Sequence, residues 1–260
     1  MPSDATSATH TPEWREDWGV PVHEAAIDPG RRIIDPHHHL WPWRDANMMS
    51  PAGAYLSAEL IKDVRSHNVV ATMAIECSVA YDPDLGPDLA SVGETAFLAR
   101  EARRLAEMNA GLRLAGIVAH IDLHSGDDVR RRVEAHRQAG QGLLKGVRQM
   151  AAYDPDGPIN ISPIEGDLYA EPAFRAGVRA AAAEGLVVDV WHYHSQADDF
   201  VALARACPES PSSSITTAPR SASALTRLGR TRSSPDGRVG SNSPRRAPTS
   251  CSSWAVSPWG

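Results

Sequence analysis

The sequence predicts an α/β protein with a TIM-barrel-like (β/α) fold that is incomplete, with about five β/α units and an irregular C-terminal tail. Two observations lead to this prediction. Short runs rich in Val and Ile alternate with amphipathic helical stretches from about residue 31 to Cys207, and the composition then changes abruptly. The 260 residues contain 42% hydrophobic residues and carry a net charge of −6, which is enough apolar material for one sizeable core.

The expected strands are short apolar runs that do not alternate cleanly, as is typical of parallel strands buried on both faces. They are Arg32–Ile34, Val69–Ile75, Leu114–Ile121, Gly142–Val147 and Leu186–Trp191.

Amphipathic stretches between these runs predict helices over residues 57–68, 91–111, 127–139, 171–184 and 198–206. Regular alternation of strands and helices predicts a parallel sheet with crossover helices. An open doubly wound sheet is the alternative, but no Gly-rich phosphate loop follows the first run.

The composition divides the chain into an N-terminal arm (residues 1–30), a partial barrel (31–207) and a tail (208–260). The last 53 residues contain 7 Arg, 2 acidic residues and 14 Ser, whereas all 11 His lie at or before His194. The net charge is therefore −11 over residues 1–207 and +5 over the tail. We expect the tail to be a disordered Ser/Pro/Arg segment or the out-of-frame reading of a longer gene.

Other features exclude broad classes of protein. No apolar run approaches the ~18 residues of a membrane span, and residues 1–35 contain no signal-peptide core. The three cysteines are widely spaced, which indicates a reducing, cytoplasmic location. We expect a small-molecule substrate and neither a membrane nor a nucleic-acid partner, because the body of the chain is acidic.

The segment Ile33–Trp41 carries the strongest chemical signal, with the sequence IIDPHHHLW. Residues two apart on a strand share a face, so His37 and His39 project together from the end of the first strand. Two imidazoles at this spacing can bind one divalent metal ion or hydrogen-bond to a substrate oxygen. The alternative without a function is a solvated histidine cluster.

This segment resembles the opening motif of the amidohydrolase-related (amidohydrolase 2) family, in its lactonase-like branch. Further segments that resemble this branch are TMAIEC (72–77), LAGIV (114–118), KGVRQ (145–149) and DVWHYHSQ (189–196). The resemblance implies a TIM-barrel hydrolase that acts on a lactone or a related cyclic ester or amide. Some relatives use a zinc-like divalent metal and some lactonases of the branch need none.

The resemblance also implies the site residues. His37 and His39 are candidate metal ligands and catalytic residues, with His194 and then His192 as catalytic partners that share a strand face. Arg148 would bind a substrate carboxylate, and a surface ion pair is the alternative. Glu76 would bind a substrate hydroxyl or make a structural hydrogen bond, and Trp41 would line the pocket or pack the first loop.

Two segments that the family's mechanism needs are missing after His194: an Asp-His-Leu-Gly-like segment and an aspartate that serves as general base after strand eight. A one-base shift within codons 214–222 permits an Asp-His-His-Gly reading, so we hypothesise a frameshift near codon 208. Resequencing the gene tests this hypothesis.

We therefore expect a hydrolase, most simply a lactonase, whose chain as written is C-terminally truncated or frameshifted and inactive. The alternatives are a metal-dependent decarboxylase of the same family and a non-catalytic fragment. Assays of lactone hydrolysis and of benzoate decarboxylation separate the two enzymes.

Overall fold

Six parallel strands form the central sheet of the computed structural model, which describes residues 27–45, 53–155 and 162–217. All of these residues belong to the first of two units into which the chain divides, residues 1–219. In spatial order the strands are β1 (Ile33–His38), β4 (Val69–Ile75), β5 (Arg113–His120), β6 (Leu144–Met150), β7 (Val187–Tyr193) and β8 (Ser212–Thr217). A separate antiparallel pair joins β2 (Trp41–Arg44) to β3 (Gly53–Tyr55).

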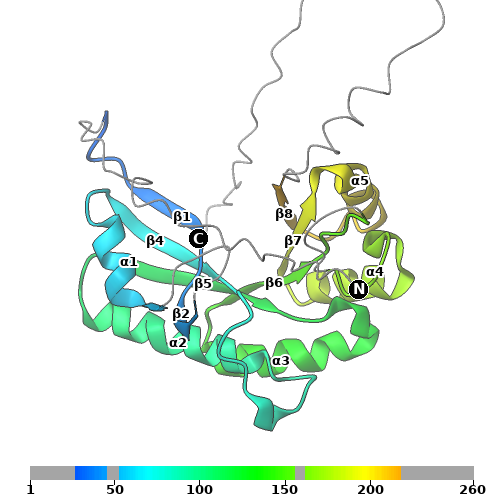
Figure 1. The fold of residues 1–260 in the computed structure, drawn as a ribbon, viewed down its shortest axis with the longest axis horizontal. Coiled ribbons are helices and arrows are strands. Elements are labelled where there is room, and N and C mark those ends of the chain that lie inside the picture. Colours follow the sequence, from blue (N-terminus) through cyan, green and yellow to red (C-terminus); the bar gives the residue numbers. More distant parts are fainter. Residues whose placement is uncertain (1–26, 46–52, 156–161, 218–260) are drawn as a thin grey trace, which may run out of the picture. The chain divides into compact units, whose positions relative to one another are not determined.

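One α-helix follows each of the first five sheet strands. The helices are α1 (Ser57–Val64), α2 (Val92–Glu107), α3 (Val129–Gly140), α4 (Pro172–Ala183) and α5 (Ala197–Ala206). Short 3-10 helices η1 (Pro83–Leu85), η2 (Leu123–Asp128), η3 (Leu168–Ala170) and η4 (His194–Gln196) lie in the connections. Figure 1 shows the sheet curling, with the described helices along its convex side.

This arrangement is an incomplete (β/α) barrel, as predicted, with five β/α units followed by a sixth strand. Crossovers from each strand to its parallel neighbour place successive strands side by side, as in closed barrels. The predicted boundary after Cys207 is corrected, because β8 pairs in parallel with β7 from Val188↔Ser212 to Tyr193↔Thr217. Most of the predicted arm (residues 1–26) and most of the predicted tail lie outside the described residues.

The core lies between the sheet and its helices. Ile117, Val147 and Val188 point toward the helices from β5, β6 and β7 and are fully buried, together with Phe174 and Val178 of α4. Since neighbouring positions on a strand face opposite sides, the residues next to Ile117, Val147 and Val188 on their strands face the concave side. The alternation therefore assigns His120, Arg148 and Asp189 to the concave face.

Glu101 of α2 fixes the start of α1 in this layer. Its buried Oε2 accepts hydrogen bonds from the Ser57 backbone N–H (3.2 Å) and the Ser57 hydroxyl (2.9 Å). Its Oε1 accepts from Arg104 at 2.6 Å. A carboxylate here satisfies a donor that the first turn of a helix leaves free.

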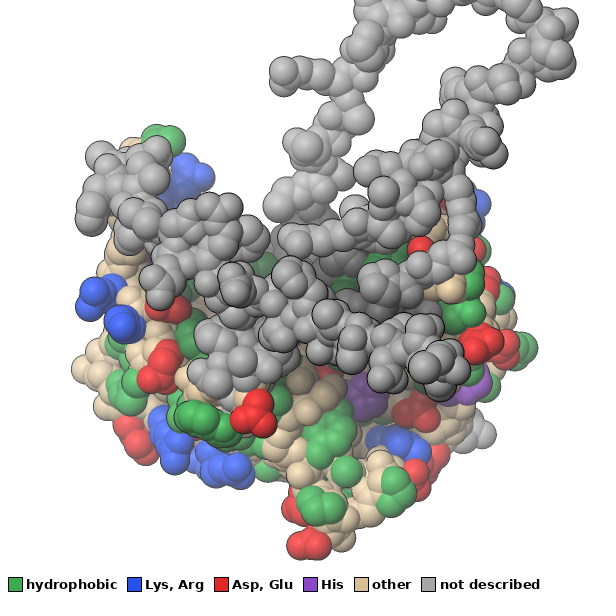
Figure 2. All heavy atoms as spheres, in the orientation of Figure 1, with side chains coloured by type: hydrophobic (Ala, Val, Ile, Leu, Met, Phe, Trp, Pro, Cys, Tyr) green, Lys and Arg blue, Asp and Glu red, His purple; other side chains and the backbone are tan. Residues whose placement is uncertain are grey.

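Ion pairs dominate the outer surface of α3, where Arg132 contacts both Asp88 (3.2 Å) and Asp128 (2.9 Å). Figure 2 shows acidic and basic side chains interspersed over the described surface of this face. Within the described ranges, none of the helices combines the length and the apolar character that crossing a bilayer requires.

Candidate functional site

A row of polar side chains crosses the concave face at one register level. His120 of β5 pairs with Arg148 of β6, Arg148 with Asp189 of β7, and Asp189 with Ser213 of β8. In a parallel sheet, paired positions point to the same side, so these four side chains form a continuous line. His120 and Arg148 lie toward the carboxyl ends of β5 and β6, the end at which (β/α) barrels bind their substrates, whereas Asp189 and Ser213 lie deeper, in the first halves of β7 and β8.

Arg148 lies in the middle of this row and is 5% exposed. Its Nε lies 3.3 Å from Asp189 Oδ2 and 3.9 Å from Glu76 Oε1, and its Nη1 donates to the Glu76 carbonyl at 3.5 Å. Ser213 in turn donates a 2.5 Å hydrogen bond to Asp189 Oδ1. One buried guanidinium thus faces two buried carboxyl groups, and burial raises the pKa of both Asp189 and Glu76.

Glu76 follows β4 directly and is 1% exposed. Neither of its carboxyl oxygens accepts a hydrogen bond of regular geometry from the described residues. The His120 and Arg148 charges and the Ser78 backbone N–H oppose the rise in its pKa. An ion pair with Arg148 is therefore part of what holds Glu76, in place of the structural hydrogen bond that was one of its two expected roles, and the oxygens retain free acceptor capacity.

His37 and His39 lie together, as predicted from their spacing. Their Nε2 atoms are 3.2 Å apart and their rings meet edge to face at 4.9 Å. His39 Nδ1 donates to the Ile75 carbonyl at 2.9 Å, which requires the proton on Nδ1 and leaves Nε2 with its lone pair. Burial, with the His39, Arg148 and His38 charges, lowers the pKa of His37 to about 4. The His37 ring is therefore in the neutral form that binds metals.

The pair fits two positions of a zinc site. Two nitrogen ligands at ~2.0–2.1 Å from a tetrahedral ion lie roughly 3.3 Å apart, close to the separation found here. The carbonyl behind His39 is the kind of second contact that orients ligating histidines. Among the described residues, however, no cluster of three His, Cys, Asp or Glu is placed to hold an ion.

The predicted pairing of His192 with His194 on one strand face is not found. β7 ends at Tyr193, and His194 begins the 3-10 helix η4, so the two-residue alternation stops between them. His192 points into the helix layer, where its Nδ1 bonds the Tyr169 hydroxyl at 2.9 Å and its ring packs on Phe200. His194 Nδ1 is buried and has no hydrogen-bond partner among the described residues.

Trp41 packs the first loop. Its ring stacks on Tyr55 at 5.1 Å and its Nε1–H donates to the Gly53 carbonyl at 3.0 Å, which joins β2 to β3. Of the two alternatives for this residue, these contacts match loop packing.

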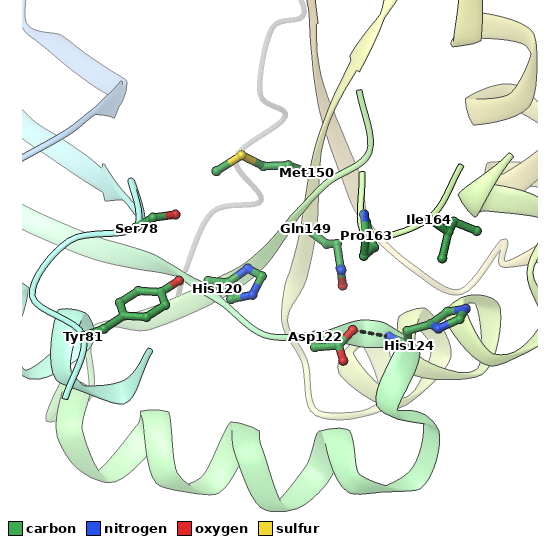
Figure 3. A pocket seen from close by; sticks show the side chains of 9 residues that line it. All are labelled: Ser78, Tyr81, His120, Asp122, His124, Gln149, Met150, Pro163 and Ile164. Carbon is green, nitrogen blue, oxygen red and sulfur yellow. Dashed lines mark hydrogen bonds between the residues drawn. The ribbon is translucent and has the colours of Figure 1, made fainter. Parts of the chain in front are cut away.

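A pocket of about 600 Å³ opens beside the polar row, at the ends of β5 and β6 (Figure 3). It is lined by Ser78, Tyr81, His120, Asp122, His124, Gln149, Met150, Pro163 and Ile164. Asp122 is engaged with the His124 backbone N–H at 3.0 Å. His120 belongs to both the row and the pocket, so the two are continuous.

Asp189 and Ser213 are the site residues that sequence reasoning did not single out. Asp189 stands between Val188 and Val190 in an apolar run, and a charged residue there is a signal in itself. Ser213 carries no such signal, because it lies in a Ser-rich stretch that was assigned to the tail.

No protein-family model matches the chain. The uncharacterised protein y4mH of Sinorhizobium fredii (strain NBRC 101917 / NGR234) is 28% identical over 192 residues, which cover 68% of this chain and 59% of that protein.

Two solved structures illustrate the similarity in fold. An amidohydrolase from Burkholderia multivorans with bound zinc is 23% identical, has a TM-score of 0.49 and is matched over 68% of this chain and 54% of its own. A probable 2-pyrone-4,6-dicarboxylic acid hydrolase from Acinetobacter baumannii with bound citric acid is 13% identical and has a TM-score of 0.43. The match covers 70% of this chain and 57% of that protein. The chain thus spans between half and three fifths of each relative's length.

Proposed function

We propose that this chain is a hydrolase of the amidohydrolase type that opens a lactone by attack of water on the ring carbonyl. This proposal replaces the expectation, drawn from the missing C-terminal segments alone, that the chain is inactive, because the described residues supply a histidine pair, Glu76 and Arg148 on one sheet. The observation that carries the proposal is the position of the buried polar atoms that make no hydrogen bond of regular geometry. Among the described residues they belong to Glu76, Glu94, His124, Arg148, Asp189 and His194. Glu94 faces the end of β4 from α2, Asp189 lies deeper in β7, and the other four lie in the second half of β6 or just after β4, β5 and β7. Buried polar groups normally find partners, so their concentration at one end supports a ligand site there.

The proposed roles follow the chemistry of each group. His37 and His194 stabilise the oxyanion that forms when water attacks the carbonyl, while His39 Nε2 keeps a lone pair that can accept a hydrogen bond or bind a metal. Arg148 offers a planar donor set for a carboxylate on the substrate. Its two acidic neighbours limit the positive charge it presents, so the preference for a carboxylated lactone is weaker than an unpaired arginine would give. We assign Trp41 to the loop that carries the histidines and His192 to the packing behind the sheet.

A zinc-like divalent ion fits the His37–His39 pair as two of its ligands. When bound, such an ion would supply Lewis-acid polarisation of the carbonyl oxygen. The roles of the other residues do not depend on it.

Two measurements test the proposal. We expect the purified chain to hydrolyse one or more members of a panel of aldonolactones and carboxylated lactones, followed by acid release in a pH-indicator assay. We also expect titration calorimetry to detect zinc binding to the purified chain. In the double variant His37→Asn/His39→Asn the zinc affinity should fall at least tenfold.

The matched control is His67→Asn, which changes an exposed histidine after α1. Failure to hydrolyse any lactone in the panel, with or without zinc, would contradict the proposal. Release of carbon dioxide from a benzoate-type acid in place of lactone hydrolysis would favour the decarboxylase.

A further inference from the structure

Glu76 has a rigidly held backbone at the end of β4. Its N–H donates to the Val118 carbonyl at 2.9 Å, which continues the parallel ladder one residue beyond the strand. The next N–H, that of Cys77, donates to Glu94 Oε1 at 2.8 Å. The position of the Glu76 side chain is therefore set from both sides by backbone contacts.

Its carboxyl group differs from the other buried carboxyl groups around it. Asp189 accepts a hydrogen bond from Ser213, and Glu94 accepts one from the Cys77 N–H. Both Glu76 oxygens are buried and accept no regular hydrogen bond from the described residues. A buried carboxyl group costs free energy unless something bonds to it, so both oxygens are available to water or substrate.

The neighbours of Glu76 place it between the two halves of the site. The carbonyl of Ile75, the preceding residue, fixes the His39 ring. On the other side, Arg148 Nε lies 3.9 Å from Glu76 Oε1 and Arg148 Nη1 bonds the Glu76 carbonyl. A carbonyl held between the imidazole pair and the guanidinium would lie next to the Glu76 carboxyl group.

We infer that Glu76 is the general base and acid of this site, a role that rests on the proposed lactone hydrolysis. Its carboxylate accepts a proton from water as the water oxygen bonds to the ring carbonyl carbon, which leaves an oxyanion. When the carbon–oxygen bond of the ring breaks, the protonated Glu76 returns that proton to the departing ring oxygen. The product is a hydroxy acid, which releases one proton to solvent, so that lactone and water balance hydroxycarboxylate and a proton.

The electrostatic surroundings agree with both halves of this cycle. Burial raises the pKa of Glu76, while the His120 and Arg148 charges restrain the rise. A raised pKa brings the protonated and ionised forms of a carboxyl group closer in free energy, which suits a group that acts as both base and acid.

The test compares Glu76→Gln, Glu76→Ala and the unchanged protein on the lactone that the panel identifies. We expect Glu76→Gln to lower kcat by about 10²–10⁴-fold with little change in KM. Formate or acetate should restore part of the activity of Glu76→Ala, because a small carboxylate can occupy the vacated space, whereas chloride should not.

Glu101→Gln is the matched control. It alters a buried glutamate that holds α1, so it should lower Tm and leave kcat unchanged at temperatures where the protein is folded. Glu76→Gln should show the opposite pattern, with Tm unchanged or raised. If the unchanged protein opens lactones and Glu76→Gln retains kcat within twofold, the inference is overturned and the proposed function survives. If the unchanged protein opens none, both are overturned.

Discussion

Arg148 and Asp189 occupy paired positions on the neighbouring strands β6 and β7, with Arg148 Nε 3.3 Å from Asp189 Oδ2. Both residues are 5% exposed. Removing one member of such a pair leaves the other charge buried and is costly, whereas removing both is much less so. The pair therefore ties the stability of the sheet to the same residues that form the proposed site.

We predict that Asp189→Asn lowers the free energy of unfolding by about 3 kcal/mol, because the buried Arg148 loses its nearest counter-charge. Arg148→Met should cost a similar amount. The double variant should lose clearly less than the sum of the two single losses, which urea unfolding at pH 7 measures. Strict additivity would show that the two side chains do not interact.

Ser213 provides a direct test of β8, because sequence reasoning placed it in the tail. Ser213→Ala removes the hydrogen bond to Asp189 Oδ1 and should cost about 1–2 kcal/mol. Ser212→Ala is the matched control, since Ser212 is exposed one position away and should change stability by less than about 0.5 kcal/mol. Equal effects of the two changes in urea unfolding would argue against the paired strand.

Local patterns predicted the parts of the site that depend on one strand. The two-residue spacing of His37 and His39 was enough to bring their rings together. The same rule failed at His192 and His194, because it holds only while the chain remains extended and β7 ends at Tyr193.

Contacts between strands were not accessible to the same reasoning. Asp189 meets Arg148 only through the register of β7 against β6, which depends on how the whole sheet packs. The three serines that begin β8 (SSSITT) have little strand propensity of their own, and the strand forms where the edge of β7 offers backbone partners.

Gly177 marks the closest approach of α4 to η2. A Cβ atom at this position would lie 1.9 Å from the Leu123 carbonyl oxygen. Helix propensity alone predicts that Gly177→Ala stabilises the protein by about 1 kcal/mol. The clash with rigid backbone predicts instead a loss of about 3 kcal/mol.

The opposite substitution on the same helix is the control for Gly177. Ala176 is exposed, so Ala176→Gly should cost only about 1 kcal/mol. Thermal unfolding of both variants distinguishes the two explanations, and a raised Tm for Gly177→Ala would contradict the close packing.

His136 of α3 is buried against α2 and should make stability depend on pH. Ser91 donates its proton to the His120 carbonyl, so His136 Nε2–H donates to Ser91 Oγ and Nδ1 accepts from Thr95 at 2.8 Å. Burial, with the His120 and Arg132 charges, lowers the pKa of His136 to about 4. The unfolded chain therefore binds the extra proton first, and stability falls as the pH drops from about 6.5 toward 4.

Comparison with His136→Asn isolates this contribution, because the other histidines are common to both proteins. The variant should be less stable at pH 7, and its free energy of unfolding should depend less steeply on pH between 7 and 5, by up to about 1.4 kcal/mol per pH unit. Urea unfolding at several pH values measures the slopes, and parallel curves would exclude a buried neutral imidazole.

Glu94 of α2 should act in the opposite direction. It is 2% exposed, and burial with the Glu76 charge raises its pKa to about 8 while the Cys77 N–H bond opposes the rise. The folded protein thus keeps a proton that the unfolded chain loses above about 4.5, so stability is greatest below that pH and is lost as the pH rises toward 8. Glu94→Gln has the same size and never ionises. It should therefore gain stability relative to the unchanged protein between pH 5 and pH 8, by up to about 1.4 kcal/mol per pH unit.

Glu107→Gln changes an exposed residue of the same helix and should follow the unchanged protein in urea unfolding at each pH. A constant difference between Glu94→Gln and the unchanged protein across this range would mean that Glu94 is already ionised in the folded state.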